Sequence, residues 1–166
     1  LWPWGSGRVL LPEHGGMLFM PQRPFLPEGS LRQALCYPLA STTFSNEALH
    51  RALECTGLAW LYPRLDETDN WEQLLPLRAQ QRLGFARVLL QNPAFLFMEE
   101  ATDAFDPKGE RLMLEMLRHE RPDMAMLTIS FHPGLETLHD RTLVLERVAE
   151  SKFLFEGRRA NGGANH

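Results

Sequence analysis

Two parts of one stretch decide the fold, Leu75–Arg82 (LPLRAQQR) and Phe95–Asp106 (FLFMEEATDAFD). Apolar residues spaced along residues 77–90, with arginines around them, predict a helix that Pro93 stops. Ala94–Met98 is continuously apolar, which predicts a parallel strand buried on both faces. Two adjacent carboxylates and a turn follow this strand. A helix followed by a buried strand that ends in two adjacent carboxylates is suited to holding a metal-nucleotide and activating a water.

The residues after this stretch predict an α/β fold. Pro107–His119 has the apolar spacing of a helix, and Met124–Ser130 predicts a second buried strand. A strand, a helix and another apolar strand in succession are typical of a parallel sheet. Arg141–Glu146 and Lys152–Phe155 predict a terminal hairpin. Gly157–His166, rich in Gly, Asn and Ala, predicts a loose tail.

The residues before the stretch predict short strands and a small helical lobe. Gly7–Leu11 and Gly16–Met20 are apolar and bounded by Gly and Pro, so we expect two strands with a turn at Pro12–Gly15. The three prolines of Pro21–Pro27 predict a stiff, ordered loop.

Two helix starts follow this loop. Ser30 is expected to cap a helix that runs through Leu35, and Ser45 or Asn46 to cap one that runs to about Gly57. The predicted organisation is therefore an incomplete core at 1–29 and 77–156, an inserted lobe at 30–76 and a flexible tail at 157–166.

Composition excludes several classes of protein. The chain has 166 residues, of which 44% are hydrophobic and 23% charged, as expected for one core with a small lobe. A net charge of −4 argues against a nucleic-acid partner. The longest apolar stretches are far shorter than the ~20 residues of a membrane span. Cys36 and Cys55 fit buried, reduced thiols of the cytosol better than a disulfide or metal site.

One expected motif is missing from the sequence. A nucleotide-hydrolysing fold places a glycine-rich loop ending in Gly-Lys-Ser or Gly-Lys-Thr before the elements described above. The 166 residues contain no such loop, and the first residue is Leu1 rather than Met. These two features suggest a cut rather than a natural start.

The motifs and their order resemble the nucleotide-binding domain of ABC transporters. The resemblance rests on a Gln loop, a helical lobe, an arginine-bearing helix, an apolar strand ending Glu-Glu-Ala-Thr and a His past the next strand, and it covers about residues 1–147. It implies a partial P-loop NTPase (RecA-like) parallel sheet with an inserted helical lobe. Met20–Phe25, Gly29–Arg32 and Tyr37–Pro38 most resemble peroxisomal fatty-acyl half-transporters and their bacterial relatives, which carry membrane helices and ATPase in one chain.

The resemblance assigns three residues to the metal-nucleotide. Gln22 matches the Gln-loop residue that reaches magnesium and water beside the membrane-domain contact; otherwise it is a plain polar loop residue. Glu99 stands where the family has an Asp that holds magnesium, and its side chain is one methylene longer. Glu100 matches the general base that polarises the attacking water; otherwise it is a surface acid at a strand end.

Two further residues have both a family role and a simpler explanation. Asp106 matches the D-loop aspartate that communicates across the dimer, but an Asp before Pro107 is also a common helix N-cap. His132 matches the switch histidine that contacts the terminal phosphate, whereas a lone His is more often structural or exposed. The residues alone leave both alternatives open.

The signature turn departs from the family pattern of Leu-Ser-Gly-Gly-Gln or Leu-Ser-Leu-Gly-Glu. The positions that in the family face the partner subunit's ATP are taken here by Pro76, Leu77, Arg78, Ala79 and Gln80. Pro76 has neither hydroxyl nor amide hydrogen, and Arg78 places a long side chain where close backbone approach favours glycine. We expect weaker phosphate binding across the dimer, although the guanidinium could itself donate to a phosphate.

The resemblance implies ATP and Mg²⁺ as cofactors, with a second ATP-binding domain and a transmembrane domain as partners. It predicts the carboxyl-terminal part of an ATP-binding domain that drives solute transport, at the cytoplasmic face of a membrane such as the bacterial inner membrane. One alternative is a degenerate, non-catalytic fragment or regulatory partner, favoured by Pro76, Arg78 and Glu99. Another is a soluble ABC ATPase of DNA repair or translation, which the proline-rich loop disfavours.

Overall fold

The computed structural model describes residues 10, 16–132, 134–148 and 152–159, and its centre is a three-stranded parallel sheet. The strands β1 (Met17–Met20), β4 (Phe95–Glu99) and β5 (Ala125–Ile129) lie in the order β1-β4-β5. Both pairings are parallel, with Phe19 opposite Phe97 and Phe97 opposite Leu127. The predicted α/β class with a parallel sheet is therefore confirmed.

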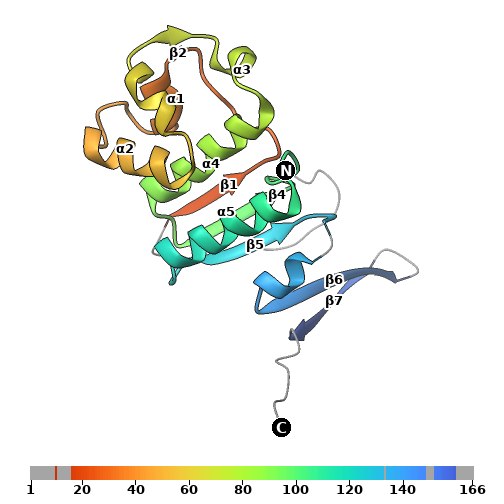
Figure 1. The fold of residues 1–166 in the computed structure, drawn as a ribbon. Coiled ribbons are helices and arrows are strands. Elements are labelled where there is room, and N and C mark those ends of the chain that lie inside the picture. Colours follow the sequence, from red (N-terminus) through yellow and green to blue (C-terminus); the bar gives the residue numbers. More distant parts are fainter. Residues whose placement is uncertain (1–9, 11–15, 133, 149–151, 160–166) are drawn as a thin grey trace.

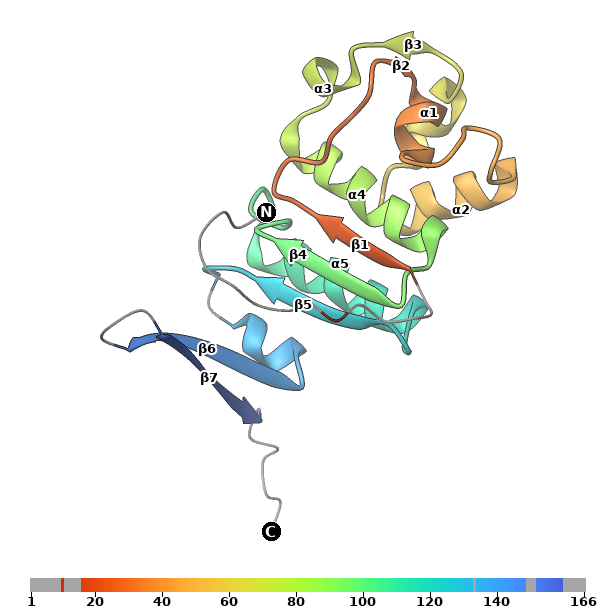
Figure 2. The same ribbon diagram turned by 180° about the vertical axis from the view of Figure 1, so that it is seen from behind.

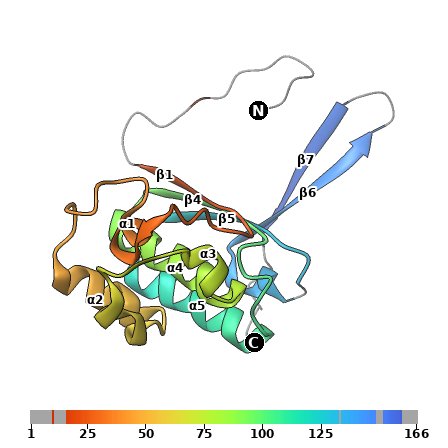
Figure 3. The same cartoon turned by 90° about the horizontal axis from the view of Figure 1, so that it is seen from above.

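The helices α4 (Leu77–Gln91) and α5 (Pro107–Glu120) lie on the same face of this sheet (Figures 1 and 3). The strand side chains that point toward them, such as Met20, Leu96 and Met98, are almost fully buried. Alternation along a strand sends neighbouring side chains to opposite faces, so these residues form one apolar layer beneath the helices.

The opposite face of the sheet, seen in Figure 2, is more exposed than the sequence predicts. Phe19 is 59% exposed and Ile129 53%, while Phe95 and Phe97 are half-buried. The expectation that β4 and β5 are buried on both faces is therefore wrong for the part of the chain described. Continuous apolar runs indicate burial, but they do not reveal which residues cover each face, and β5 is an edge strand in the described sheet.

The lobe beside α4 contains α1 (Leu31–Cys36), α2 (Asn46–Cys55), η1 (Ala59–Arg64) and α3 (Trp71–Leu74). Both predicted starts are confirmed. The Ser30 hydroxyl accepts from the Gln33 amide in a reciprocal capping box, and the Ser45 hydroxyl accepts from the Ala48 amide. The strands β2 (Gly29–Ser30) and β3 (Thr68–Asp69) were not predicted, because two-residue strands carry no periodicity.

Arg87 in α4 connects this lobe to the rest of the protein. The residue is 7% exposed, and its guanidinium donates from Nε to the Ala34 carbonyl at 2.9 Å and from Nη2 to the Phe25 carbonyl at 2.8 Å. It also lies over the Tyr37 ring, 5.5 Å from the centroid. Burial lowers the pKa of Arg87 to about 10, so the group keeps its charge at neutral pH.

The chain ends in η2 (Leu135–Leu138) and an antiparallel hairpin of β6 (Arg141–Val148) and β7 (Lys152–Arg159). The hairpin is confirmed and is longer than predicted. Residues 157–159 belong to β7, so their assignment to a loose tail is wrong, whereas residues 160–166 lie outside the described residues. So do the predicted strand at 7–11, apart from Leu10, and the turn at 12–15.

Two smaller predictions concern the cysteines and membrane spans. Cys36 is a buried free thiol whose pKa is raised by burial, and Cys55 is a half-buried free thiol. Among the residues that the structure describes, none of the helices is both long and apolar enough to span a bilayer.

Candidate functional site

The candidate site lies where the three parallel strands end. Gln22 follows β1, Glu99 and Glu100 close β4, and His132 follows β5. Because the carboxyl ends of parallel strands share one edge, the fold gathers these side chains from distant parts of the sequence.

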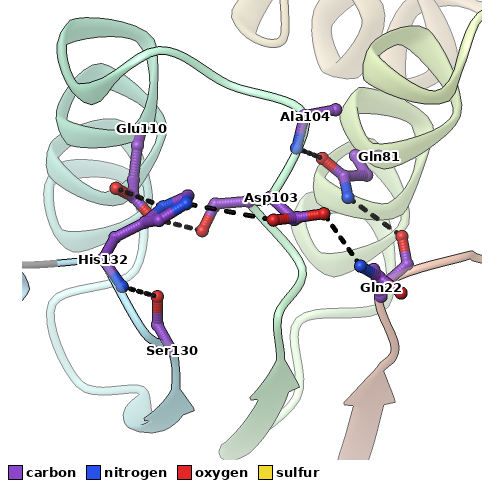
Figure 4. Close-up of polar contacts among 8 residues, drawn as sticks. Gln22, Gln81, Asp103, Ala104, Glu110, Ser130 and His132 are labelled. Atoms are coloured by element: carbon purple, nitrogen blue, oxygen red, sulfur yellow. Dashed lines mark hydrogen bonds and ion pairs between the residues drawn. The ribbon is translucent and has the colours of Figure 1, made fainter.

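Gln22 is fixed from two sides (Figure 4). Its Nε2 donates to Asp103 Oδ2 at 2.8 Å, and its main-chain carbonyl accepts from Gln81 Nε2 at 2.9 Å. The Oε1 of Gln81 in turn accepts from the Ala104 amide at 3.1 Å. Gln81 is fully buried in α4, so this helix holds the loop after β1 and the turn after β4 together.

His132 lies between two acids (Figure 4). Its Nδ1 is 3.1 Å from both carboxylate oxygens of Glu110, and its Nε2 is 3.9 Å from Asp103 Oδ1. The Thr102 hydroxyl donates to Glu110 as well. The backbone amide of His132 donates to Ser130 Oγ at 3.1 Å. His132 is therefore an anchored residue rather than a free surface histidine.

Glu100 leaves the strand through an unusual backbone conformation. Its φ of 49° lies in the left-handed region, and its amide donates to the Ile129 carbonyl at 2.9 Å. Non-glycine residues adopt this region at a cost, and such strain is common at functional sites. The turn directs Glu100 away from the path of β4, whereas Glu99 ends the strand with an exposed side chain.

The altered turn at the start of α4 makes an ion pair within the chain. Arg78 Nη2 lies 2.5 Å from Asp106 Oδ1, and the guanidinium lies over Phe105, 5.4 Å from the ring centroid. A Cβ on Gly109 would come within 2.9 Å of Arg78 Nη2 and 2.8 Å of Asp106 Oδ1. Glycine at 109 thus leaves room for the pair.

This pair bears on the alternatives for Asp106. The residue occupies the N-cap position of α5, followed by Pro107, but its side chain makes no capping hydrogen bond. Its carboxylate accepts from Arg78 instead. The simple N-cap explanation therefore accounts for its backbone but not for its side chain.

The other residues of the turn differ in accessibility. Pro76 is the N-cap of α4, without a side-chain cap, and is exposed, whereas Leu77 is half-buried and Ala79 buried. Gln80 is buried, with Nε2 donating to the carbonyls of Glu72 at 2.7 Å and Leu75 at 2.8 Å. Gln80 therefore closes the turn and does not reach outward.

Sequence reasoning missed four residues of this network: Gln81, Thr102, Asp103 and Glu110. The first three lie inside the quoted stretch, but no spacing in it indicates that their side chains meet. Glu110 carried no local signal, because its position in the first turn of a helix is typical of a solvent-exposed acid. Its inward direction becomes visible only when α5 packs against β5.

These residues do not form a complete Mg-ATP site. Within the part of the chain that the structure describes, no group of three or more His, Cys, Asp or Glu side chains is arranged to hold a metal ion. Gln22 gives its amide to Asp103 rather than to Glu99. The sequence contains no phosphate-cradling glycine-rich loop.

Curated proteins with similar sequences are ABC transporter ATP-binding proteins. An uncharacterised one from Haemophilus influenzae is 34% identical over 146 residues, covering 88% of this chain and 24% of that protein. ABC transporter D family member 1 of Arabidopsis thaliana is 32% identical over 157 residues, covering 88% of this chain and 12% of the relative. No model of a protein family matches the chain.

A solved structure shares the fold. A bacterial Atm1-family ABC exporter, solved with ATP bound, matches with a TM-score of 0.69 at 24% identity, over 81% of this chain and 24% of the exporter chain. The chain thus spans less than a quarter of the length of each of these three proteins. From these sequence relatives, which include a member of the D family, this chain belongs to the ATP-binding domains of ABC transporters.

Proposed function

We propose that the chain is the carboxyl-terminal part of an ATP-binding domain that couples ATP binding and hydrolysis to solute transport across a membrane. The observation that carries this proposal is the gathering of Gln22, Glu100 and His132 at one edge of a parallel sheet. Hydrogen bonds and the close approach of His132 to Asp103 link the first and last of these residues.

The proposed roles follow from chemistry and position. Glu100, turned out of its strand, would polarise the attacking water, and His132 would contact the terminal phosphate through Nε2. Gln22 would orient water near the metal, and Glu99 would bind magnesium, whose charge stabilises the phosphates. The missing phosphate-cradling amides would have to come from residues outside this sequence.

Two surfaces support the proposed partners. A hollow of about 320 Å³ beside the proline-rich loop is lined by Phe19, Pro21, Phe25 and Tyr37, with Arg87 among the lining residues. Its largely apolar lining suits a transmembrane domain that docks beside Gln22 at the cytoplasmic face. The turn 76–79 and Asp106 would face the second ATP-binding domain, with residues 30–76 acting as the lobe that presents the turn.

A second candidate, a non-catalytic partner within an ABC dimer, is favoured by one observation. Arg78 and Asp106, both predicted to face the other domain, are paired with each other. Pro76 offers neither hydroxyl nor amide hydrogen at the start of α4. The turn as folded therefore has fewer donors for a phosphate than the family pattern provides.

ATPase activity of the natural gene product, measured in membranes, separates the two candidates. With a catalytic domain, Glu100→Gln should lower turnover by about 10²–10⁴-fold, the usual contribution of a general base. Glu115→Gln is the matched control, because Glu115 is exposed on α5 and the charge change is identical. Equal turnover in wild type and Glu100→Gln would refute the catalytic role and leave the non-catalytic partner.

A further inference from the structure

Glu110 is a buried acid that the proposed function does not use. It is 3% exposed, the ionisable side chain beside it is that of His132, and in the part of the chain described it has no Lys or Arg ion pair. The carboxylate accepts a hydrogen bond from the Thr102 hydroxyl, and both of its oxygens lie 3.1 Å from His132 Nδ1. A buried carboxylate needs donors around it, and here a hydroxyl and an imidazole supply them.

We propose that Glu110 is a positioning residue that fixes the tautomer and orientation of His132. A carboxylate only accepts hydrogen bonds, so the hydrogen of the neutral imidazole lies on Nδ1. In the neutral ring the other nitrogen, Nε2, which lies 3.9 Å from Asp103 Oδ1, then has no hydrogen, and it can donate to a phosphate oxygen only when the ring is protonated. An acid that binds one ring nitrogen and so decides what the other can do is a recurrent arrangement at functional histidines.

The contact reaches beyond His132 to the loop after β1. Asp103 Oδ1 is 3.9 Å from His132 Nε2, and Asp103 Oδ2 accepts from Gln22 Nε2 at 2.8 Å. Glu110, His132, Asp103 and Gln22 therefore lie in a row along the sheet edge, joined by hydrogen bonds at both ends and by the 3.9 Å approach of His132 to Asp103 between them (Figure 4). Glu110 is the most buried acid of this row and anchors its ring end.

The tautomer can be measured on the 166-residue chain itself by ¹⁵N-edited NMR of its histidine rings. The His132 signals are those lost in His132→Gln. At a pH where the ring is neutral, we expect Nδ1 to carry the hydrogen. A hydrogen on Nε2 would overturn the inference, and this measurement needs no Glu110 variant to fold.

Glu110→Gln gives the second test. Because Thr102 donates to Oε1, the new amide group would take the place of Oε2, facing Nδ1 as a donor. The ring should then switch toward the Nε2–H tautomer. In the spectrum, Nε2 should take the ¹⁵N chemical shift of a protonated ring nitrogen and Nδ1 that of an unprotonated one. Glu115→Gln, an exposed control on the same helix, should leave the His132 signals unchanged. Unchanged His132 signals in a folded Glu110→Gln chain would overturn the inference.

The inference rests on the proposed function only for what His132 does to a phosphate. The tautomer is measured without nucleotide, so loss of the catalytic proposal leaves this result standing. Conversely, an Nε2–H tautomer would remove the role of Glu110 while the ATPase comparison remained valid.

Discussion

The two ends of α4 use the same residue type in opposite ways. Near its start, Arg78 is paired with Asp106 at the surface, where the two side chains are 47% and 60% exposed. Two turns further on, Arg87 is buried and donates to carbonyls of α1 and of the proline-rich loop. The buried arginine holds the lobe in place, whereas the surface arginine can vary without damage to the fold. An altered signature turn is therefore compatible with an intact structure.

The largest effect on stability is expected from a substitution in the buried part of α4. Phe85 is fully buried in α4 and meets Phe105 edge-on, with ring centroids 6.1 Å apart. Phe85→Ala should lower the free energy of unfolding by about 3–5 kcal/mol, through lost burial and a residual cavity. Urea denaturation measures the change. Leu112→Ala, at an exposed position of α5, is the control and should change it by less than about 0.5 kcal/mol.

The next effect concerns Arg87 itself. Arg87→Leu would leave the carbonyls of Ala34 and Phe25 without their donor inside the protein, at a cost of about 2–4 kcal/mol in unfolding free energy. Arg87→Lys should recover part of this loss, because an ammonium can still bond one carbonyl. Arg111→Leu, at an exposed position of α5, is the matched control. A loss no greater than the control's would show that Arg87 does not hold the lobe.

A smaller effect is expected at the surface end of α4. Asp106→Asn removes the charge that pairs with Arg78 but keeps a good N-cap residue, so unfolding free energy should fall by at most about 1 kcal/mol. The difference from wild type should vanish near 1 M salt, where the screening length is about 3 Å. A salt-independent loss of several kcal/mol would mean that the two ends of α4 are equally structural.

The smallest effect is that of nucleotide on the chain alone. Stabilisation by a ligand grows with its concentration relative to Kd, and the sequence lacks the amides and lysine that hold phosphates. Mg-ATP at about 1 mM should leave the thermal unfolding midpoint of residues 1–166 unchanged within about 1 °C. Saturable, tight binding in a calorimeter would contradict this prediction and show that residues 1–166 hold the phosphates without a glycine-rich loop.

The elements that sequence predicts well are those whose signal is local. The helix α4, the serine caps of α1 and α2 and the strand β4 each depend on residues close in the chain, and all are confirmed as elements. The shared edge for Gln22, Glu100 and His132 follows from the parallel direction of the strands.

The rest depends on contacts between distant residues. The Arg78–Asp106 pair joins positions 28 apart, and the Glu110–His132 contact joins positions 22 apart, with no spacing rule to reveal either. The exposure of Phe19 and Ile129 depends on what lies over the sheet rather than on their own apolar character. The roles of the site residues remain predictions.

Gln81 has a consequence for movement. This buried amide donates to the loop after β1 and accepts from the turn after β4, so both of its polar ends are occupied. If α4 rotated relative to the sheet, it would either carry both loops along or lose two hydrogen bonds at about 1–3 kcal/mol for each group left unsatisfied. Helix and loops should consequently shift as a single rigid unit, so that a displacement of the lobe reaches Gln22 and Asp103 at the same moment.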